Sequence, residues 1–193
     1  TNRYEYGDRH LRSETSLQAD IGTEVNTEHL SLSTTGFVNN IDDFIFYRKL
    51  SNINGGDSLV NVDGEDITAF TFSQAKALLY GAELYIDIHP HPLDWLHFEN
   101  TFSYVRGAFN QPIEGVKNIP FIPAARLITQ LKGEFLKKGK RISNLSITAE
   151  LDNTFRQNKA FTAYSTETPT KGYSLLNAFI GADIMHHKKT LFS

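Results

Sequence analysis

Apolar residues recur at every second position in several segments of the chain, most clearly over residues 78–88. There Leu84 and Ile86 belong to the apolar set, whereas Glu83 and Asp87 belong to the interleaved, mixed set. Successive side chains of a strand point to opposite faces, so a period of two predicts a strand with one apolar face.

A helix is the alternative for the start of this segment. Ala75, Leu78, Leu79 and Ala82 also fit helical spacing. The alternation continues to Ile88, however, and this favours a strand.

The same alternation predicts further strands elsewhere in the chain. They lie around residues 17–22, 30–47, 96–104, 127–132, 145–152 and 176–184. Together with 78–88 they make seven strands, and an eighth begins at Leu191. Most are longer than the usual globular strand of about 5–6 residues. They fit the roughly 9–11 residues with which a strand crosses a bilayer.

Short and long connections between these segments alternate along the chain. The short ones are near residues 23–28, 89–94, 137–140 and 186–189, and the long ones are near 48–66, 110–123 and 156–172. An up-and-down antiparallel sheet with tight turns at one end has this pattern, which is typical of outer-membrane barrels. We therefore predict an all-β fold, an antiparallel up-and-down meander that forms about seven to eight strands of a partial transmembrane β-barrel.

One face of this sheet should meet lipid and the other an aqueous lumen. The expected lipid face comprises Leu78, Ala82, Leu84, Ile86, Ile88, Leu96, Phe98, Leu145, Ile147 and Ala149. The expected lumen-facing, ligand-contacting candidates are Glu83, Glu99, Arg126 and Glu150. Gly81, in the same strand, predicts a bend or a close approach of another group to the backbone.

Aromatic residues gather near the ends of the predicted strands. Those near the long connections are Phe37, Phe44, Phe46, Tyr47, Phe70, Phe72, Tyr104, Phe109, Phe155 and Tyr173, and those beside short turns are Trp95 and Phe135. Membrane proteins place belts of aromatic residues, called girdles, at both membrane–water interfaces. The alternative is that aromatics are simply common in strands.

Composition excludes several classes of protein. The 193 residues are 40% hydrophobic and 21% charged, with a formal charge of −3 and no cysteine. Without cysteine there is no disulfide scaffold, thiol nucleophile or Cys-type zinc site. The near-neutral charge argues against a nucleic-acid partner. Because the chain lacks an initiator Met and ends as an apolar segment begins, we expect a fragment of a longer protein.

Five segments in register resemble the C-terminal part of the β-barrel of TonB-dependent outer-membrane receptors. Residues 14–22 are similar to the family's Glu-x-Ser…Gly strand, and residues 35–45 resemble a strand end with spaced Phe and Ile. Residues 77–84 resemble a small-x-x-x-Gly-x-Glu strand. Residues 100–104 and 119–126 resemble the following strand and its loop exit.

The resemblance implies a barrel of about 22 strands around an N-terminal plug, in the outer membrane. Residues 1–193 would then be a barrel fragment without a plug domain, and TonB would contact an N-terminal region that this sequence lacks. It also implies active import of a scarce ligand, such as a metal–siderophore complex. A passive porin-type barrel fragment and a soluble β-sandwich that binds glycans are the alternatives.

Other candidate chemistry is weaker. His89 and His91, and likewise His186 and His187, could bind a metal, but solvated turn histidines are the expectation. The acidic side chains Glu83, Glu99, Glu150 and Asp183 are expected to be lumen carboxylates rather than paired catalytic acids. No hydrolase or phosphate-loop motif occurs. We therefore expect no enzyme activity, no catalytic residue, no metal site and no cofactor.

Overall fold

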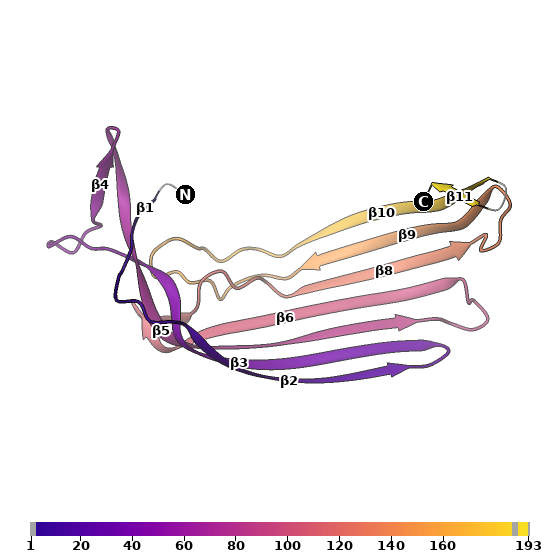
Figure 1. The fold of residues 1–193 in the computed structure, drawn as a ribbon, viewed down its shortest axis with the longest axis horizontal. Helices are drawn as coiled ribbons and strands as arrows, with labels where there is room; N and C mark the ends of the chain where they lie inside the picture. Colours follow the sequence, from indigo (N-terminus) through magenta and orange to yellow (C-terminus); the bar gives the residue numbers. More distant parts are fainter. Residues whose placement is uncertain (1–2, 187–188, 193) are drawn as a thin grey trace.

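The computed structural model describes residues 3–186 and 189–192. Figure 1 shows long strands lying side by side, with their connections gathered at two ends. The strands are β1 (Arg3–Tyr6), β2 (Thr15–Asn26), β3 (Leu30–Lys49), β4 (Leu59–Val62), β5 (Glu65–Ile88), β6 (Leu96–Ile113), β7 (Val116–Asn118), β8 (Arg126–Phe135), β9 (Ile142–Thr154), β10 (Tyr173–His186) and β11 (Lys189–Phe192). Over the described ranges, no helix is long and apolar enough to cross a membrane.

The strands form one eleven-stranded sheet among the described residues. Its main path runs β11-β10-β9-β8-β6-β5-β3-β2, and each neighbouring pair on this path is antiparallel. The short strands β1 and β4 pair with β5, and β7 pairs with β6. The prediction of an up-and-down meander that forms part of a barrel is confirmed. The helical alternative for residues 75–82 is wrong, because β5 includes all of them.

Short and long connections lie at opposite ends of the sheet, as predicted (Figure 1). Residues 27–29, 89–95 and 136–141 form the short turns. The long connections contain β4, β7 and the irregular segment 155–172. The turn between β10 and β11, which includes His187, lies outside the described residues. Below, the two ends are called the short-turn end and the long-loop end.

The register places the predicted lipid-facing residues on one face. Ile88 pairs with Phe98, Phe98 with Leu131, and Leu131 with Ala149. Directly paired residues of antiparallel strands share a face, so the predicted set on β5, β6 and β9 lies together. We call this the apolar face and the opposite one, which carries Glu83, the polar face.

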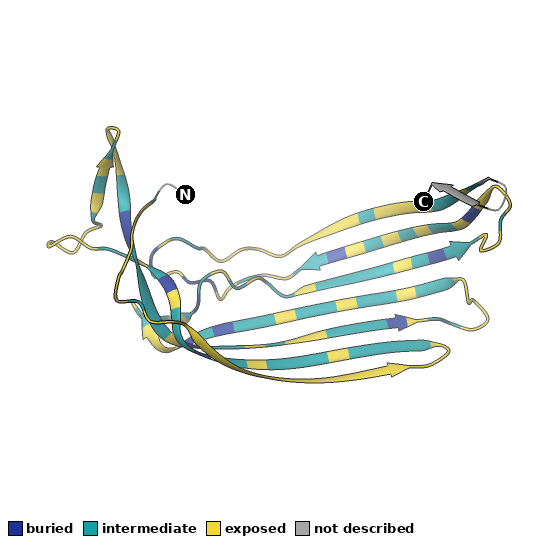
Figure 2. Cartoon of the chain, in the orientation of Figure 1, coloured by how far each residue is buried: buried dark blue, intermediate teal, exposed yellow. Residues whose placement is uncertain are grey.

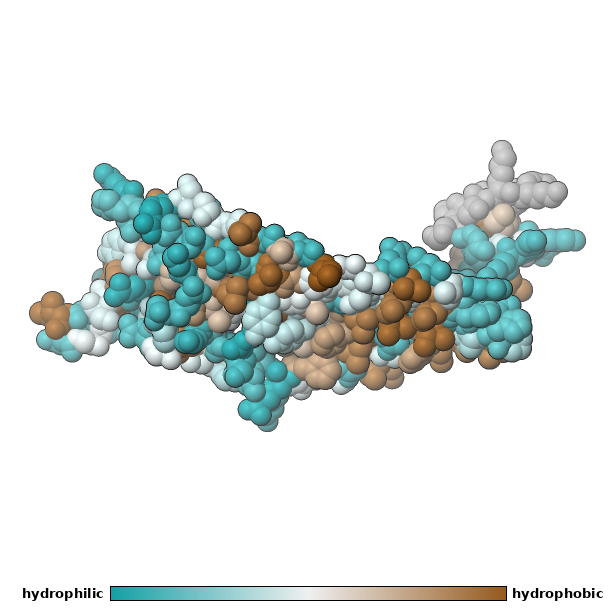
Figure 3. Space-filling view, turned by 90° about the horizontal axis from the view of Figure 1, so that it is seen from below, coloured by the Kyte–Doolittle hydropathy of each residue, from teal (hydrophilic) through white to brown (hydrophobic). Residues whose placement is uncertain are grey.

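Side chains of the apolar face project without cover. Ile21 is 79% exposed and Leu176 is 80% exposed. Every residue of β2 is exposed (Figure 2). In the view of Figure 3, apolar residues gather along the strands, and hydrophilic residues gather towards both ends. One sheet with a bare apolar face does not fit the alternative of a soluble sandwich, in which two sheets bury their apolar faces against each other.

A β-bulge in β3 changes the face that two aromatic residues occupy. The register with β5 shifts between Ile41 and Phe44, and Asp43 has a φ of 59°. Because one extra residue reverses the alternation, Phe44 and Phe46 lie on the polar face. Without the bulge they would lie on the apolar face.

The prediction of an interfacial aromatic girdle is therefore wrong for part of the long-loop end. Phe46, Phe70 and Phe109 are buried in one cluster with Ile119, Phe161 and Tyr164. The girdle stays a prediction for Tyr47 and Phe72, whose ring centroids are 4.8 Å apart. It also stays a prediction for Trp95 and Phe135, which stack at 5.1 Å beside the short turns.

Gly81 lies where a neighbouring ring approaches the backbone. A Cβ atom at this position would meet Cε1 of Phe37 at 2.5 Å and would also clash with the carbonyl oxygen of Tyr104. The predicted close approach is confirmed, and it leaves room for the Phe37 ring next to β5 on the polar face.

Candidate functional site

Polar side chains cross the polar face in aligned rows. One row joins five strands through the paired residues Asp87, Glu99, Gln130, Glu150 and Asn177. Gln130 Nε2 donates to Glu150 Oε2 at 2.5 Å, and Asn177 Nδ2 donates to Glu150 Oε1 at 2.8 Å. Both oxygens of Glu150 are thus held by neighbours, so its carboxylate is fixed in position while the row stays acidic.

A second row brings Glu83 and Arg126 near each other. Glu83 pairs with Ser103, and Ser103 pairs with Arg126. Glu83 and Arg126 line one cavity of about 350 Å³, together with Phe37. The register thus places all four predicted candidates on the polar face, in two separate rows, and their contact with a ligand stays a prediction.

Arg126 is oriented by a partner that the sequence did not reveal. Its Nε donates to Asp152 Oδ1 at 2.8 Å, and its Nη2 donates to Asp152 Oδ2 at 2.6 Å. Asp152 is buried, whereas Arg126 remains exposed. A two-pronged contact of this kind fixes the guanidinium plane, so Arg126 presents a fixed positive charge beside the cavity.

The segment 155–172 folds over the polar face at the long-loop end. Its Phe161 is buried with ring centroids 5.9 Å from Phe109 and 5.3 Å from Tyr164. Burial raises the pKa of the Tyr164 phenol, which therefore stays neutral at physiological pH. The loop thus covers the polar face at the long-loop end with a cluster of aromatic rings.

Hydrogen bonds join this segment to the neighbouring long connection. Asn118 Nδ2 donates to the carbonyl oxygen of Ala160 at 3.1 Å. Glu167 accepts from the backbone N–H of Phe121 at 2.6 Å and from that of Phe161 at 3.2 Å. Sequence reasoning missed these residues, because the loops have no periodicity that would indicate their contacts.

A basic cavity of about 340 Å³ lies where β6 extends beyond β8. Arg106, Arg156 and Lys159 line it, beside the backbone of Gly107. Arg106 Nη2 donates to Asn118 Oδ1 at 2.9 Å. Three cationic side chains around one cavity suit an anionic group.

At the short-turn end, the structure separates the first histidine pair. His89 Nε2 lies 2.5 Å from Asp87 Oδ2, whereas the His91 ring lies 5.6 Å from that of His29. The expectation of a solvated turn residue is wrong for His89, which is half-buried against Asp87 and His97.

Among the remaining carboxylates named from the sequence, Asp183 Oδ2 accepts from Asn144 Nδ2 at 2.7 Å. Asp183 therefore has a neutral neighbour that holds it as an ordinary polar-face carboxylate. Because Asn144 is not an acid, this contact does not pair Asp183 with a second carboxylate.

A sequence model of the family described as TonB dependent receptor-like, beta-barrel, matches residues 1–191. The match covers almost the whole chain, including all five segments that resemble the family.

Solved structures of similar fold include two transporters and one receptor. The copper transporter OprC has a TM-score of 0.67 at 16% identity, with 87% of this chain covered. The FrpB iron transporter from Neisseria meningitidis (F3-3 variant) has a TM-score of 0.60 at 14% identity, with 97% covered. The siderophore receptor PirA from Acinetobacter baumannii has a TM-score of 0.52 at 16% identity, with 89% covered. The chain spans 23%, 26% and 25% of the length of these three structures, respectively.

Proposed function

The chain belongs to the TonB-dependent receptor β-barrel family, and from this premise we propose that its sheet is part of the wall of an outer-membrane importer. The main support for this proposal is that one face of the sheet is apolar and exposed, whereas the other is polar and hydrogen-bonded. A barrel wall in a bilayer needs such a division, because its outer side meets hydrocarbon and its inner side meets water.

In this orientation, Leu84 and its neighbours contact lipid, and the rows of Glu83 and Glu99 line the lumen. The long-loop end then faces the cell exterior and the short-turn end faces the periplasm, as in other outer-membrane barrels. The plug and the segment that contacts TonB are supplied by other parts of the receptor.

We propose that the ligand is a metal ion or a metal chelate. The support is indirect: proteins of similar fold are named as a copper transporter, an iron transporter and a siderophore receptor. Glu83 and Arg126, at one cavity, are the lumen residues best placed to contact a passing ligand, and Glu99 and Glu150 follow in the second row.

A passive porin is the rival proposal. It shares the architecture but needs no energy source. Family membership favours active uptake, and we propose that the protein has no enzymatic role.

The test is uptake by a strain in which the gene is deleted. Growth should be compared on single sources of iron, copper, haem, vitamin and glycan, with and without the gene restored. We expect loss of one metal source, and we expect loss of TonB or collapse of the proton gradient to abolish the restored uptake. Uptake that persists without TonB would favour the porin.

A further inference from the structure

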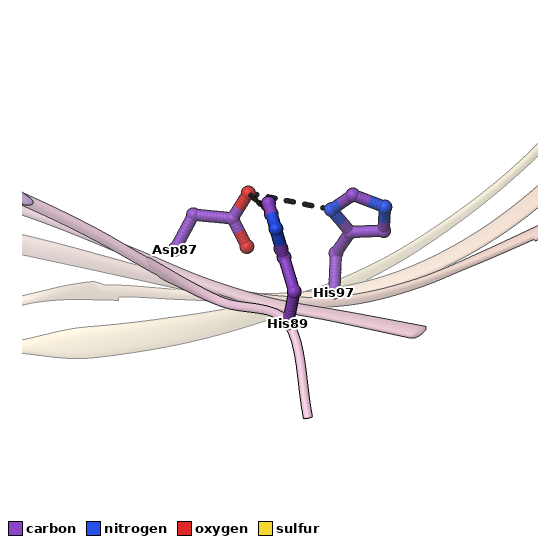
Figure 4. A group of neighbouring side chains, drawn as sticks. All are labelled: Asp87, His89 and His97. Atoms are coloured by element: carbon purple, nitrogen blue, oxygen red, sulfur yellow. Dashed lines mark hydrogen bonds and ion pairs between the residues drawn. The ribbon is translucent and has the colours of Figure 1, made fainter. Parts of the chain in front are cut away.

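Two imidazoles and a carboxylate converge at the short-turn end, on the polar face. Asp87 lies near the end of β5, His89 directly follows that strand, and His97 lies at the start of β6 (Figure 4). Asp87 Oδ2 lies 2.5 Å from His89 Nε2 and 3.3 Å from His97 Nδ1. One potential ligand atom from each residue lies within 4.8 Å of the others.

We propose that Asp87, His89 and His97 bind a divalent transition-metal ion. This goes beyond the proposed function, because it rests on the hairpin register and on these three side chains, whatever the receptor imports.

The carboxylate of Asp87 provides the second, independent observation. The residue is only 7% exposed, and its Oδ1 is buried with no hydrogen-bond partner among the described residues. A buried carboxylate oxygen without a partner is costly, and a bound ion is one established reason for finding one. A cation bound by this carboxylate through Oδ2, the oxygen that faces both imidazoles, would offset the cost of burying its negative charge.

His97 has a further partner of the kind that metal-binding histidines use. While Nδ1 faces Asp87, Nε2 lies 3.8 Å from Glu134 Oε2. A ligating histidine commonly directs its other ring nitrogen to a carboxylate, which fixes the tautomer and ring orientation. Glu134 is therefore a positioning residue for His97.

Nearby cations keep Glu134 in that role. Lys132 Nζ lies 2.7 Å from Glu134 Oε1, and Lys137 Nζ lies 3.6 Å from Glu134 Oε2. Glu134 pairs with these lysines and is not one of the three residues whose potential ligand atoms converge, so the ligand set stays two histidines and one carboxylate.

This ligand set selects the class of metal. Imidazole suits zinc, copper, nickel and iron, whereas calcium and magnesium prefer oxygen ligands alone. Bonds of about 2.0–2.1 Å to a tetrahedral zinc ion place ligand atoms about 3.3 Å apart. The Asp87–His97 separation already has this value, and a zinc ion bound by the three residues would keep a fourth position for water.

The test measures metal binding by the full-length receptor that carries this chain. The detergent-solubilised, EDTA-stripped protein is titrated with Co²⁺, followed by its visible absorption, and with Zn²⁺, followed by calorimetry. We expect Asp87→Asn and His97→Gln each to remove one equivalent of bound metal and the matching cobalt absorption. His91→Ala, in the same turn but outside the cluster, should bind as the wild type does.

A third variant tests the role of Glu134. Glu134→Gln should keep the stoichiometry and weaken affinity by about tenfold or more, as loss of a carboxylate behind a ligand does. Heat-modifiable gel mobility identifies folded protein for every variant. Unchanged stoichiometry in both folded ligand variants, or an equal loss in His91→Ala, would overturn the proposal. Failure of the uptake assay would leave these binding results intact.

Discussion

The two faces of the sheet are built from the same strands but are stabilised differently. On the polar face, side chains hold one another: Gln130 and Asn177 bind Glu150, and Asp152 binds Arg126. On the apolar face, Ile21 and similar residues project with little contact to other side chains. Side chains of the polar face are thus stabilised by hydrogen bonds to one another, whereas those of the apolar face depend on the medium that covers them.

The long-loop end departs from this division. There the polar face carries Phe46 and Phe109, covered by Phe161 from the segment 155–172. Apolar residues therefore occur in two environments, one closed by the protein and one left to its surroundings.

The largest effect should come from removing the surrounding medium. The 193-residue chain alone has a bare apolar face, and the main path of its sheet ends at the edge strands β2 and β11, which have unpaired backbone groups. Such surfaces exceed what soluble monomers tolerate. We expect association in detergent-free buffer, measured by analytical ultracentrifugation. A stable monomer with its apolar face still bare would contradict this account of the apolar face.

A pair of phenylalanines compares the closed and open apolar environments. In the full-length receptor, Phe109→Ala should lower the free energy of unfolding by about 3–5 kcal/mol, because its buried ring leaves a cavity. Phe98→Ala, on the apolar face and 40% exposed, should cost clearly less. Denaturant unfolding in detergent measures the free energy of unfolding of both variants. Equal losses would show that packing in the aromatic cluster contributes no extra stability.

Adjacent residues of β5 test the opposition of the faces directly. Leu84→Arg should destabilise the folded receptor by about 2–4 kcal/mol, the cost of arginine on a lipid-facing position near the midplane. Glu83→Arg, one residue away, should leave folding almost unchanged. Heat-modifiable mobility and abundance in membranes report both, and similar behaviour of the two variants would reverse or remove the assignment.

The smallest effect concerns the polar rows. Gln130→Ala removes one of the two donors to Glu150 and should cost about 1 kcal/mol of unfolding free energy. A double-mutant cycle with Asn177→Ala should give a non-zero coupling, because both donors share one carboxylate. Strict additivity would mean that the row is a set of independent contacts.

The sequence was sufficient to predict the eight strands of the main path, the alternation of turns and the two faces, but not the short strands β1, β4 and β7. The alternation of period two can be read within a single strand. Because directly paired residues share a face, the faces assigned on β5 extend through the register to β6, β8 and β9. The bulge at Asp43 was not predictable from this pattern, and one extra residue there moved Phe44 and Phe46 to the opposite face.

The site was only partly predictable for a related reason. The faces of Glu83, Glu99, Arg126 and Glu150 followed from alternation, but their partners depend on register between strands. Asp87 and His97 meet because Ile88 pairs with Phe98. The length of a loop such as 89–95 does not fix that register, so the spacing of the histidines suggested His89 with His91 instead.

The row of Asp87, Glu99 and Glu150 also has an electrostatic consequence. These three carboxylates lie in one row across neighbouring strands, with Gln130 between the last two. In the proposed lumen they form an arc of negative potential, and such walls concentrate counterions and speed their entry. Cations should therefore accumulate along this row, and less so as added salt shortens the screening length, about 8 Å at physiological ionic strength.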